Sequence, residues 1–186
     1  MTSEAERKTV KPYSAAVVHA PVMGVRDNET ARATQRQNAE RAAAMIDHLM
    51  SMVSDPPRLL VFPVLFMTGV NRRHRKATLD AVAQQLPTEL LDPIVAACAR
   101  HNVYFASTTQ EVHPDFPGSH FHTAILVGPE GLVLRAPKAQ AYSAPGVTPL
   151  RDLYDEYAAR YGEEAILPVA KTPIGNIGML IEKEIL

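Results

Sequence analysis

The chain has 186 residues, of which 46% are hydrophobic and 21% are charged, and its formal net charge is −1. These values are typical of a globular protein, and the length suits one domain better than two. A balanced charge creates no long-range field, so we expect neither nucleic acid nor an anionic membrane as a partner. The longest apolar run, residues 59–66, is too short to span a bilayer.

The single cysteine, Cys98, excludes an internal disulfide framework and favours a reducing cytoplasm as the compartment. Residues 1–11 are polar and charged without the apolar stretch of a secretory signal, which also favours the cytoplasm. We therefore expect a flexible leader over residues 1–12 and one domain over residues 13–186.

Helices are predicted where apolar residues recur at helical spacing, and strands where they run continuously between turn residues. Asp27 or Asn28 is expected to cap the first helix, and Asp92 the second. Helices are predicted over 27–53, 92–102 and 148–162, and strands over 13–19, 59–62, 103–106, 121–127, 132–134, 167–170 and 177–181. The strand 59–62 is expected to be buried on both faces, and the last four strands to form two hairpins. This order predicts an α/β fold, a mixed sheet with helices on one face.

Three segments carry motifs. Leu59–Gly69 is a strand followed by Phe-Pro and a turn that ends in Thr-Gly. Phe121–Lys138 is a hairpin that ends in a lysine. Thr172–Glu184 is a strand that leads into a turn. Taken in this order, the three segments resemble the motifs of the carbon–nitrogen hydrolase (nitrilase/amidase) superfamily, in its N-terminal portion.

The resemblance implies an α-β-β-α sandwich, incomplete because the chain ends just after the strand that leads to the nucleophile. It also implies a small amide or nitrile as the substrate, a homo-oligomer, and no cofactor or metal. In the family a cysteine thiolate attacks the substrate carbon, a glutamate moves the proton, and a lysine stabilises the developing negative charge.

Only one of the three family residues is matched. Lys138 stands at the lysine position, whereas Val64 stands at the glutamate position and Glu182 at the cysteine position. Valine cannot accept a proton, and a carboxylate is a poor nucleophile toward an amide. Removing members of a cooperating catalytic set removes most of its rate enhancement. We therefore expect no hydrolysis, and we expect Glu182 to neutralise Lys138 in an ion pair.

Other candidates have simpler interpretations. Cys98 lies on an apolar helix stripe and is expected to be a buried structural thiol. His113, His120 and His122 lack a further ligand at suitable spacing, so we expect loop and edge histidines with no metal. The basic run at residues 71–76 is expected to be an exposed loop.

Three hypotheses on function follow. The chain is an active hydrolase, a non-catalytic pseudo-enzyme subunit, or a truncated fragment without an independent role. Val64 and Glu182 oppose the first, and the expected incompleteness of the fold favours the third over the second.

Overall fold

The computed structural model describes residues 10–69, 76–140 and 146–185. Helix α1 spans Ala31–Met52, α2 Lys76–Val82, α3 Asp92–His101 and α4 Tyr154–Tyr161. The short helical turns η1, η2, η3 and η4 span Glu89–Leu91, Leu150–Leu153, Glu163–Ala165 and Glu182–Ile185. The strands are β1 Ala15–Val17, β2 Leu59–Val61, β3 Tyr104–Val112, β4 His120–Gly128, β5 Gly131–Pro137, β6 Val169–Thr172 and β7 Gly175–Gly178.

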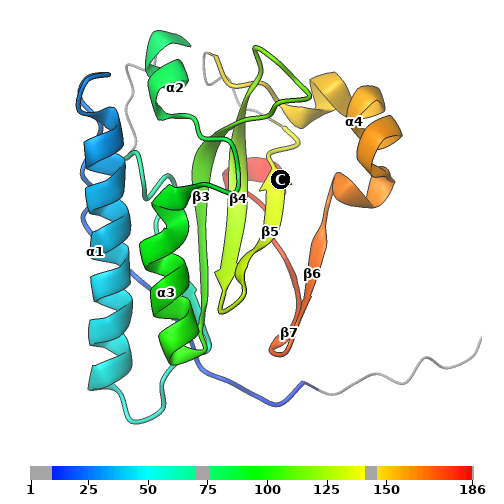
Figure 1. The fold of residues 1–186 in the computed structure, drawn as a ribbon. Coiled ribbons are helices and arrows are strands. Elements are labelled where there is room, and N and C mark those ends of the chain that lie inside the picture. Colours follow the sequence, from blue (N-terminus) through cyan, green and yellow to red (C-terminus); the bar gives the residue numbers. More distant parts are fainter. Residues whose placement is uncertain (1–9, 70–75, 141–145, 186) are drawn as a thin grey trace, which may run out of the picture.

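Strands β1 to β5 form one mixed sheet in sequence order (Figure 1). The strands β1, β2 and β3 pair in parallel, and the β3–β4 and β4–β5 pairs are antiparallel. The strands β6 and β7 form a separate antiparallel hairpin. The mixed α/β architecture and both hairpins that we predicted from the sequence are confirmed.

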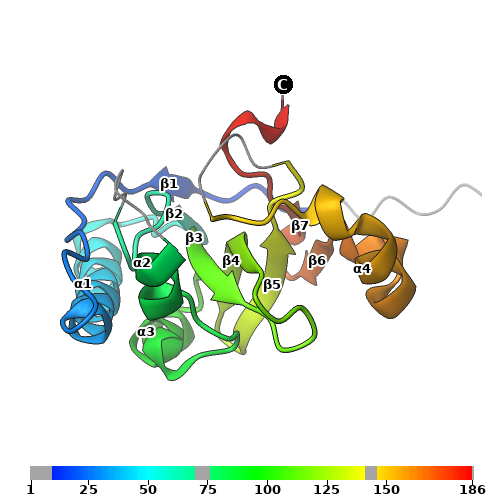
Figure 2. The ribbon, with the colours of Figure 1, turned by 90° about the horizontal axis from the view of Figure 1, so that it is seen from above.

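Helices α1 and α3 cover one face of the sheet, and the β6–β7 hairpin lies against the other (Figure 2). On the helix face, Ile46 of α1 and Ile94 of α3 pack with Leu60 and Phe105 of the sheet. On the opposite face, Ala170 of β6 packs with the strands β3 to β5. The resulting layers are helix, sheet and hairpin. In the described part of the chain, the helices lack the combination of length and apolar composition that a bilayer span requires.

The hairpin face is covered at β3 to β5 but open at the first two strands. The side chain of Val17 in β1 is 83% exposed, and Val61 in β2 is also exposed, whereas Leu60 is buried on the helix face. The expectation that strand 59–62 is buried on both faces is therefore wrong: on the hairpin face Leu59 is only partly buried and Val61 is exposed.

Some predicted boundaries are also wrong. Thr30 rather than Asp27 or Asn28 precedes α1, and the Asp27 carboxylate instead accepts hydrogen bonds from the backbone and hydroxyl of Thr30 (2.8 and 2.7 Å). Asp92 is the first residue of α3 and Leu91 precedes it. Strand β7 ends at Gly178, three residues before Ile181, because β6 is its partner over only four residues.

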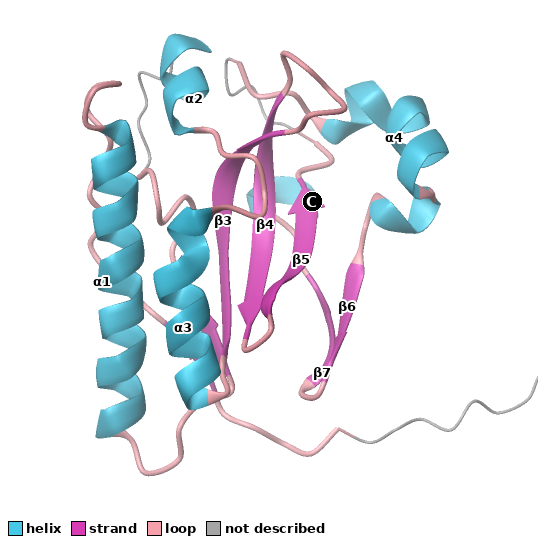
Figure 3. Ribbon diagram, viewed as in Figure 1, coloured by secondary structure: helices cyan, strands magenta, loops and turns pink. Residues whose placement is uncertain are grey.

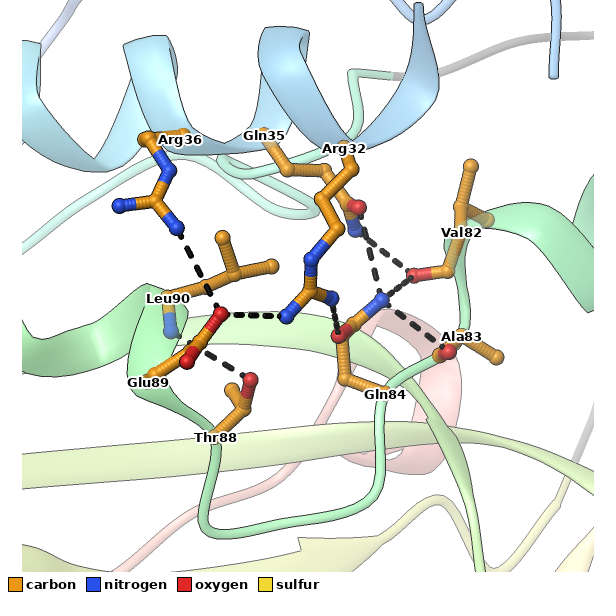
Figure 4. A network of polar contacts seen from close by, with 9 residues as sticks. All are labelled: Arg32, Gln35, Arg36, Val82, Ala83, Gln84, Thr88, Glu89 and Leu90. Atoms are coloured by element: carbon orange, nitrogen blue, oxygen red, sulfur yellow. Dashed lines mark hydrogen bonds and ion pairs between the residues drawn. The ribbon is translucent and has the colours of Figure 1, made fainter. Parts of the chain in front are cut away.

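A polar network joins the first turns of α1 to the segment that follows α2 (Figure 4). The buried amide of Gln35 donates to the carbonyl of Val82 at 2.7 Å. Arg32 donates to the side chains of Gln84 (3.0 Å) and Glu89 (2.7 Å). The backbone of Gln84 also forms an isolated parallel β-bridge with Glu111 of β3. The network therefore connects the helix layer to the sheet.

Candidate active site

The candidate site lies at the end of the sheet where β5 finishes and β4 begins. Lys138 follows β5, and its backbone N–H donates to the carbonyl of His122 at 2.8 Å, which extends the β4–β5 pairing by one step. The side chains of His122 and Lys138 therefore project from directly opposed positions on one face of the sheet. Gln110 of β3 is opposite His122 in the register, so the row continues across three strands.

Glu182 begins the turn η4 and reaches Lys138 from the hairpin layer. The Nζ atom of Lys138 lies 2.8 Å from Oε2 of Glu182. The lysine side chain is 5% exposed and the glutamate side chain is 52% exposed. The ion pair expected from the sequence is therefore present. Buried charges need such a partner, because an ammonium without one would lose hydration without compensation.

The backbone of Glu182 has the geometry of a sharp elbow, with φ of 53°. This left-handed conformation costs a non-glycine residue roughly 1–2 kcal/mol. The carboxylate of Glu184 holds the turn in place, because Oε2 accepts from the Ile181 N–H at 2.7 Å. Its Oε1 accepts from the Ala139 N–H at 2.5 Å, which ties η4 to the segment after β5. Figure 3 draws that segment as a loop leading out of the strand β5.

Val64 lies in the turn after β2, where the side chain is partly buried. The next residue, Leu65, also has a positive φ of 53°, and its N–H donates to the hydroxyl of Thr108 at 2.8 Å. The same hydroxyl lies 2.7 Å from Nε2 of His122. A chain of direct contacts therefore links the Val64 turn through Thr108 and His122 to Lys138.

His122 is uncharged at neutral pH. The pKa of its imidazole is lowered from 6.5 to about 4, chiefly by burial; the Glu182 carboxylate opposes this shift and the Lys138 ammonium adds to it. The ring is buried between the strands, so a positive charge there would be poorly solvated. The site therefore holds one ammonium, one carboxylate and one neutral imidazole.

The sequence analysis missed three polar residues that the structure places around the site, namely Thr108, Gln110 and Glu184. Thr108 and Gln110 are buried in β3, which runs six residues beyond the predicted strand 103–106. Gln110 Oε1 has no hydrogen-bond partner among the described residues. The signal available in the sequence was the polar stretch 107–111, which reads as a loop although it continues a buried strand.

The other histidines have protein partners of their own. His120 Nε2 lies 2.9 Å from Asp80 Oδ1, and His113 Nδ1 accepts from the backbone N–H of Asp115 at 3.1 Å. His113 lies in the loop after β3, as expected, whereas His120 and His122 lie on β4, an inner strand of the sheet, so the expectation of edge histidines is wrong for these two. All three rings are buried. The basic run at 71–76 lies largely outside the described residues.

Cys98 is fully buried on α3, as predicted. Burial raises the pKa of its thiol to about 12. Because the thiolate is the reactive form of cysteine, this thiol is inert at neutral pH and is no displaced nucleophile.

Two kinds of solved structure share the fold. An N-terminal amidase with an Asn-Glu-Ala peptide superposes with a TM-score of 0.57 at 13% identity, over 73% of this chain and 30% of that one. Nit3 of Saccharomyces cerevisiae, a member of branch 10 of the nitrilase superfamily, superposes with a TM-score of 0.59 at 17% identity, over 84% and 51%. The chain thus spans 30% and 51% of the length of these two proteins. The predicted incompleteness of the sandwich stays a prediction.

No curated protein sequence matches the chain. A sequence model of the carbon–nitrogen hydrolase family, by contrast, matches residues 14–186. That match runs through all three motif segments and through Val64, Lys138 and Glu182. The chain belongs to the carbon–nitrogen hydrolase family.

Proposed function

We propose that this chain is a carbon–nitrogen hydrolase family member that does not hydrolyse amides or nitriles. The 2.8 Å ion pair between Lys138 and Glu182 carries the proposal. By the motif resemblance, Glu182 takes the position of the family cysteine. A carboxylate lies beside the lysine where the resemblance places the family thiol, so the group that would attack the substrate carbon is absent. The proposed compartment, from the single buried cysteine, is the cytoplasm.

The chemistry of the two substituted positions supports inertness. A Glu182 carboxylate would have to form an acyl anhydride with the substrate, which is a high-energy intermediate. Val64 offers no lone pair that could take a proton from water or from a nucleophile. Losing both the nucleophile and its base typically removes roughly 10⁴- to 10⁶-fold of the rate.

Ammonia release from a panel of small amides and nitriles tests this proposal. We expect no release above the protein-free rate from the wild-type chain. Release that Lys138→Ala abolishes would overturn the proposal. The double variant Val64→Glu/Glu182→Cys, which restores the two family residues, serves as the positive control. We expect it to release more ammonia than the wild type.

Accessibility of the elbow can be checked separately with a thiol reagent. We expect the native wild-type chain to be unreactive, because its single thiol is buried. The Glu182→Cys variant should react at one thiol, because the side chain at this position is half exposed.

A second candidate function is that of a non-catalytic subunit, paired with another copy or with an active family member. The open part of the hairpin face favours it, since Val17 and Val61 are exposed there. Leu180, in the segment between β7 and η4, is exposed as well. Size-exclusion chromatography with light scattering tests this candidate. A defined oligomer supports it, whereas a monomer or a heterogeneous aggregate contradicts it.

A further inference from the structure

The site places three groups of complementary chemistry together. Glu182 contributes a carboxylate, Lys138 an ammonium 2.8 Å from it, and His122 an imidazole at the strand position opposite Lys138. None of these groups needs sulfur, and none needs the missing family glutamate. The chemistry open to this site is therefore the chemistry of a carboxylate, an ammonium and an imidazole that lie close together.

A carboxylate is a poor nucleophile toward an amide but an effective general base toward an acidic C–H bond. An ammonium stabilises the oxyanion that forms when a carbon next to a carbonyl loses its proton. The ammonium of Lys138 has three N–H donors, and the bond to Glu182 uses one of them.

The imidazole adds a donor without adding charge. His122 is neutral at physiological pH. Its Nε2 lies 2.7 Å from the Thr108 hydroxyl, and when that hydroxyl donates to Nε2 the ring proton is carried by Nδ1. An uncharged imidazole beside a glutamate base is a known arrangement for abstracting a proton next to a carbonyl.

We propose that this site catalyses reversible proton abstraction from the carbon next to the carbonyl of a small hydroxycarbonyl compound. This activity goes beyond the absence of hydrolysis proposed above. In the forward step the C–H bond breaks, its proton passes to the Glu182 carboxylate, and the electron pair moves onto the carbonyl oxygen. Lys138 and His122 hydrogen-bond the resulting enolate, and return of the proton from Glu182 restores the carbonyl compound.

Gln110 selects the hydroxycarbonyl class. Its Oε1 atom is buried beside His122 and has no partner among the residues that the structure describes. Buried acceptors in native proteins are nearly always satisfied by protein or water, so a donor on a ligand would complete the hydrogen bonding of this atom. A hydroxyl on the carbon next to the carbonyl provides such a donor. The half-exposed Glu182 puts the outer side of the ion pair in contact with solvent.

Hydrogen–deuterium exchange into dihydroxyacetone tests the proposal. The full chain is incubated with dihydroxyacetone in D₂O, and loss of the methylene signal is followed by proton NMR. We expect the wild-type rate to exceed the buffer rate, with a roughly 10²-fold loss of the excess in Glu182→Gln. Lys138→Met should lower it as well, while the exposed Glu40→Gln variant on α1 keeps the wild-type rate.

Glu182→Asp distinguishes loss of the base from a folding defect. It keeps a carboxylate and should therefore keep part of the exchange. A wild-type rate equal to the buffer rate would overturn the proposal. So would equal rates in wild type, Glu182→Gln and Lys138→Met, which would assign the exchange to surface amines. The ammonia assay reads out a different reaction, so either proposal can fail without the other.

Discussion

The Lys138 ammonium and the Glu182 carboxylate are 2.8 Å apart, yet one side chain is almost fully buried and the other is half exposed. Removing the carboxylate and removing the ammonium should therefore have unequal effects on stability. Without the carboxylate, the buried ammonium keeps its charge with no counter-ion. Without the lysine, the carboxylate can turn toward water.

We predict that Glu182→Gln lowers the free energy of unfolding by about 1–3 kcal/mol, and that Lys138→Met lowers it by less. Urea denaturation followed by circular dichroism measures both. Glu40→Gln is the matched control, because Glu40 is exposed on α1. A larger loss in Lys138→Met than in Glu182→Gln would contradict the asymmetry.

Acid should weaken the fold through His122. Its folded-state pKa is lowered to about 4 from the ordinary 6.5, so the unfolded chain takes up this proton more readily. The stabilisation is complete above pH 6.5 and is lost as the pH falls toward 4. Between pH 7 and pH 4.5 we expect His122→Gln to lose roughly 2–3 kcal/mol less unfolding free energy than the wild type.

Urea midpoints at the two pH values measure this difference. The exposed His48→Gln variant on α1 serves as the control and should follow the wild type. If His122→Gln showed the same acid sensitivity as the wild type, the buried neutral state of His122 would be refuted.

A second buried pair joins β3 to β5. Arg135 Nε lies 2.8 Å from Glu111 Oε1, and Thr123 donates to the same carboxylate at 2.5 Å. The carboxyl of Glu111 is 1% exposed, and burial raises its pKa although Arg135 and Thr123 oppose the rise. Arg135→Met would leave this carboxylate without its cation, at a cost of about 2–4 kcal/mol.

The double variant Glu111→Leu/Arg135→Met should recover part of that loss, because no unpaired charge remains. Arg151→Met is the control, since Arg151 is largely exposed and forms a longer pair with Asp152. Thermal unfolding of the wild type, the single variants Glu111→Leu and Arg135→Met, and the double variant gives the coupling between the two positions. A coupling near zero would show that the pair is not interacting as described.

Gly69, in the turn that follows Val64, should tolerate no side chain. Its φ is +69°, and a Cβ there would lie 2.7 Å from the Cα of Gly24. Gly118 has a similar φ of +82° but open space around it. We expect Gly69→Ala to destabilise the fold by about 2–4 kcal/mol and Gly118→Ala by about 1 kcal/mol. Equal melting temperatures for the two variants would show that the close contact with Gly24 adds nothing to the cost of Gly69→Ala.

Short sequence patterns correctly predicted the helices and strands that depend on neighbouring residues alone. The turn Pro129-Glu130 marks the β4–β5 hairpin, and the apolar spacing along α1 marks a long helix. Strand β3 was predicted at less than half its length, because residues 107–111 are polar yet buried. Sequence periodicity cannot distinguish a polar strand at a functional site from a loop.

The site itself could be predicted only in part. Lys138 and Glu182 were paired from the family resemblance, because 44 residues separate them and no spacing rule connects them. The contribution of Thr108 depends on a tertiary contact with His122 and on the backbone of Leu65. Helix α2 was missed because its seven residues follow a basic run and carry little apolar periodicity.

The left-handed backbone at Glu182 bears on how this position changes over time. Glycine would adopt that conformation without steric conflict, and a single nucleotide change in a glutamate codon is enough to encode it. Such a change would relieve the backbone and at the same time remove the counter-ion of Lys138, which aspartate would keep. We therefore expect aspartate at this position to be tolerated more readily than glycine.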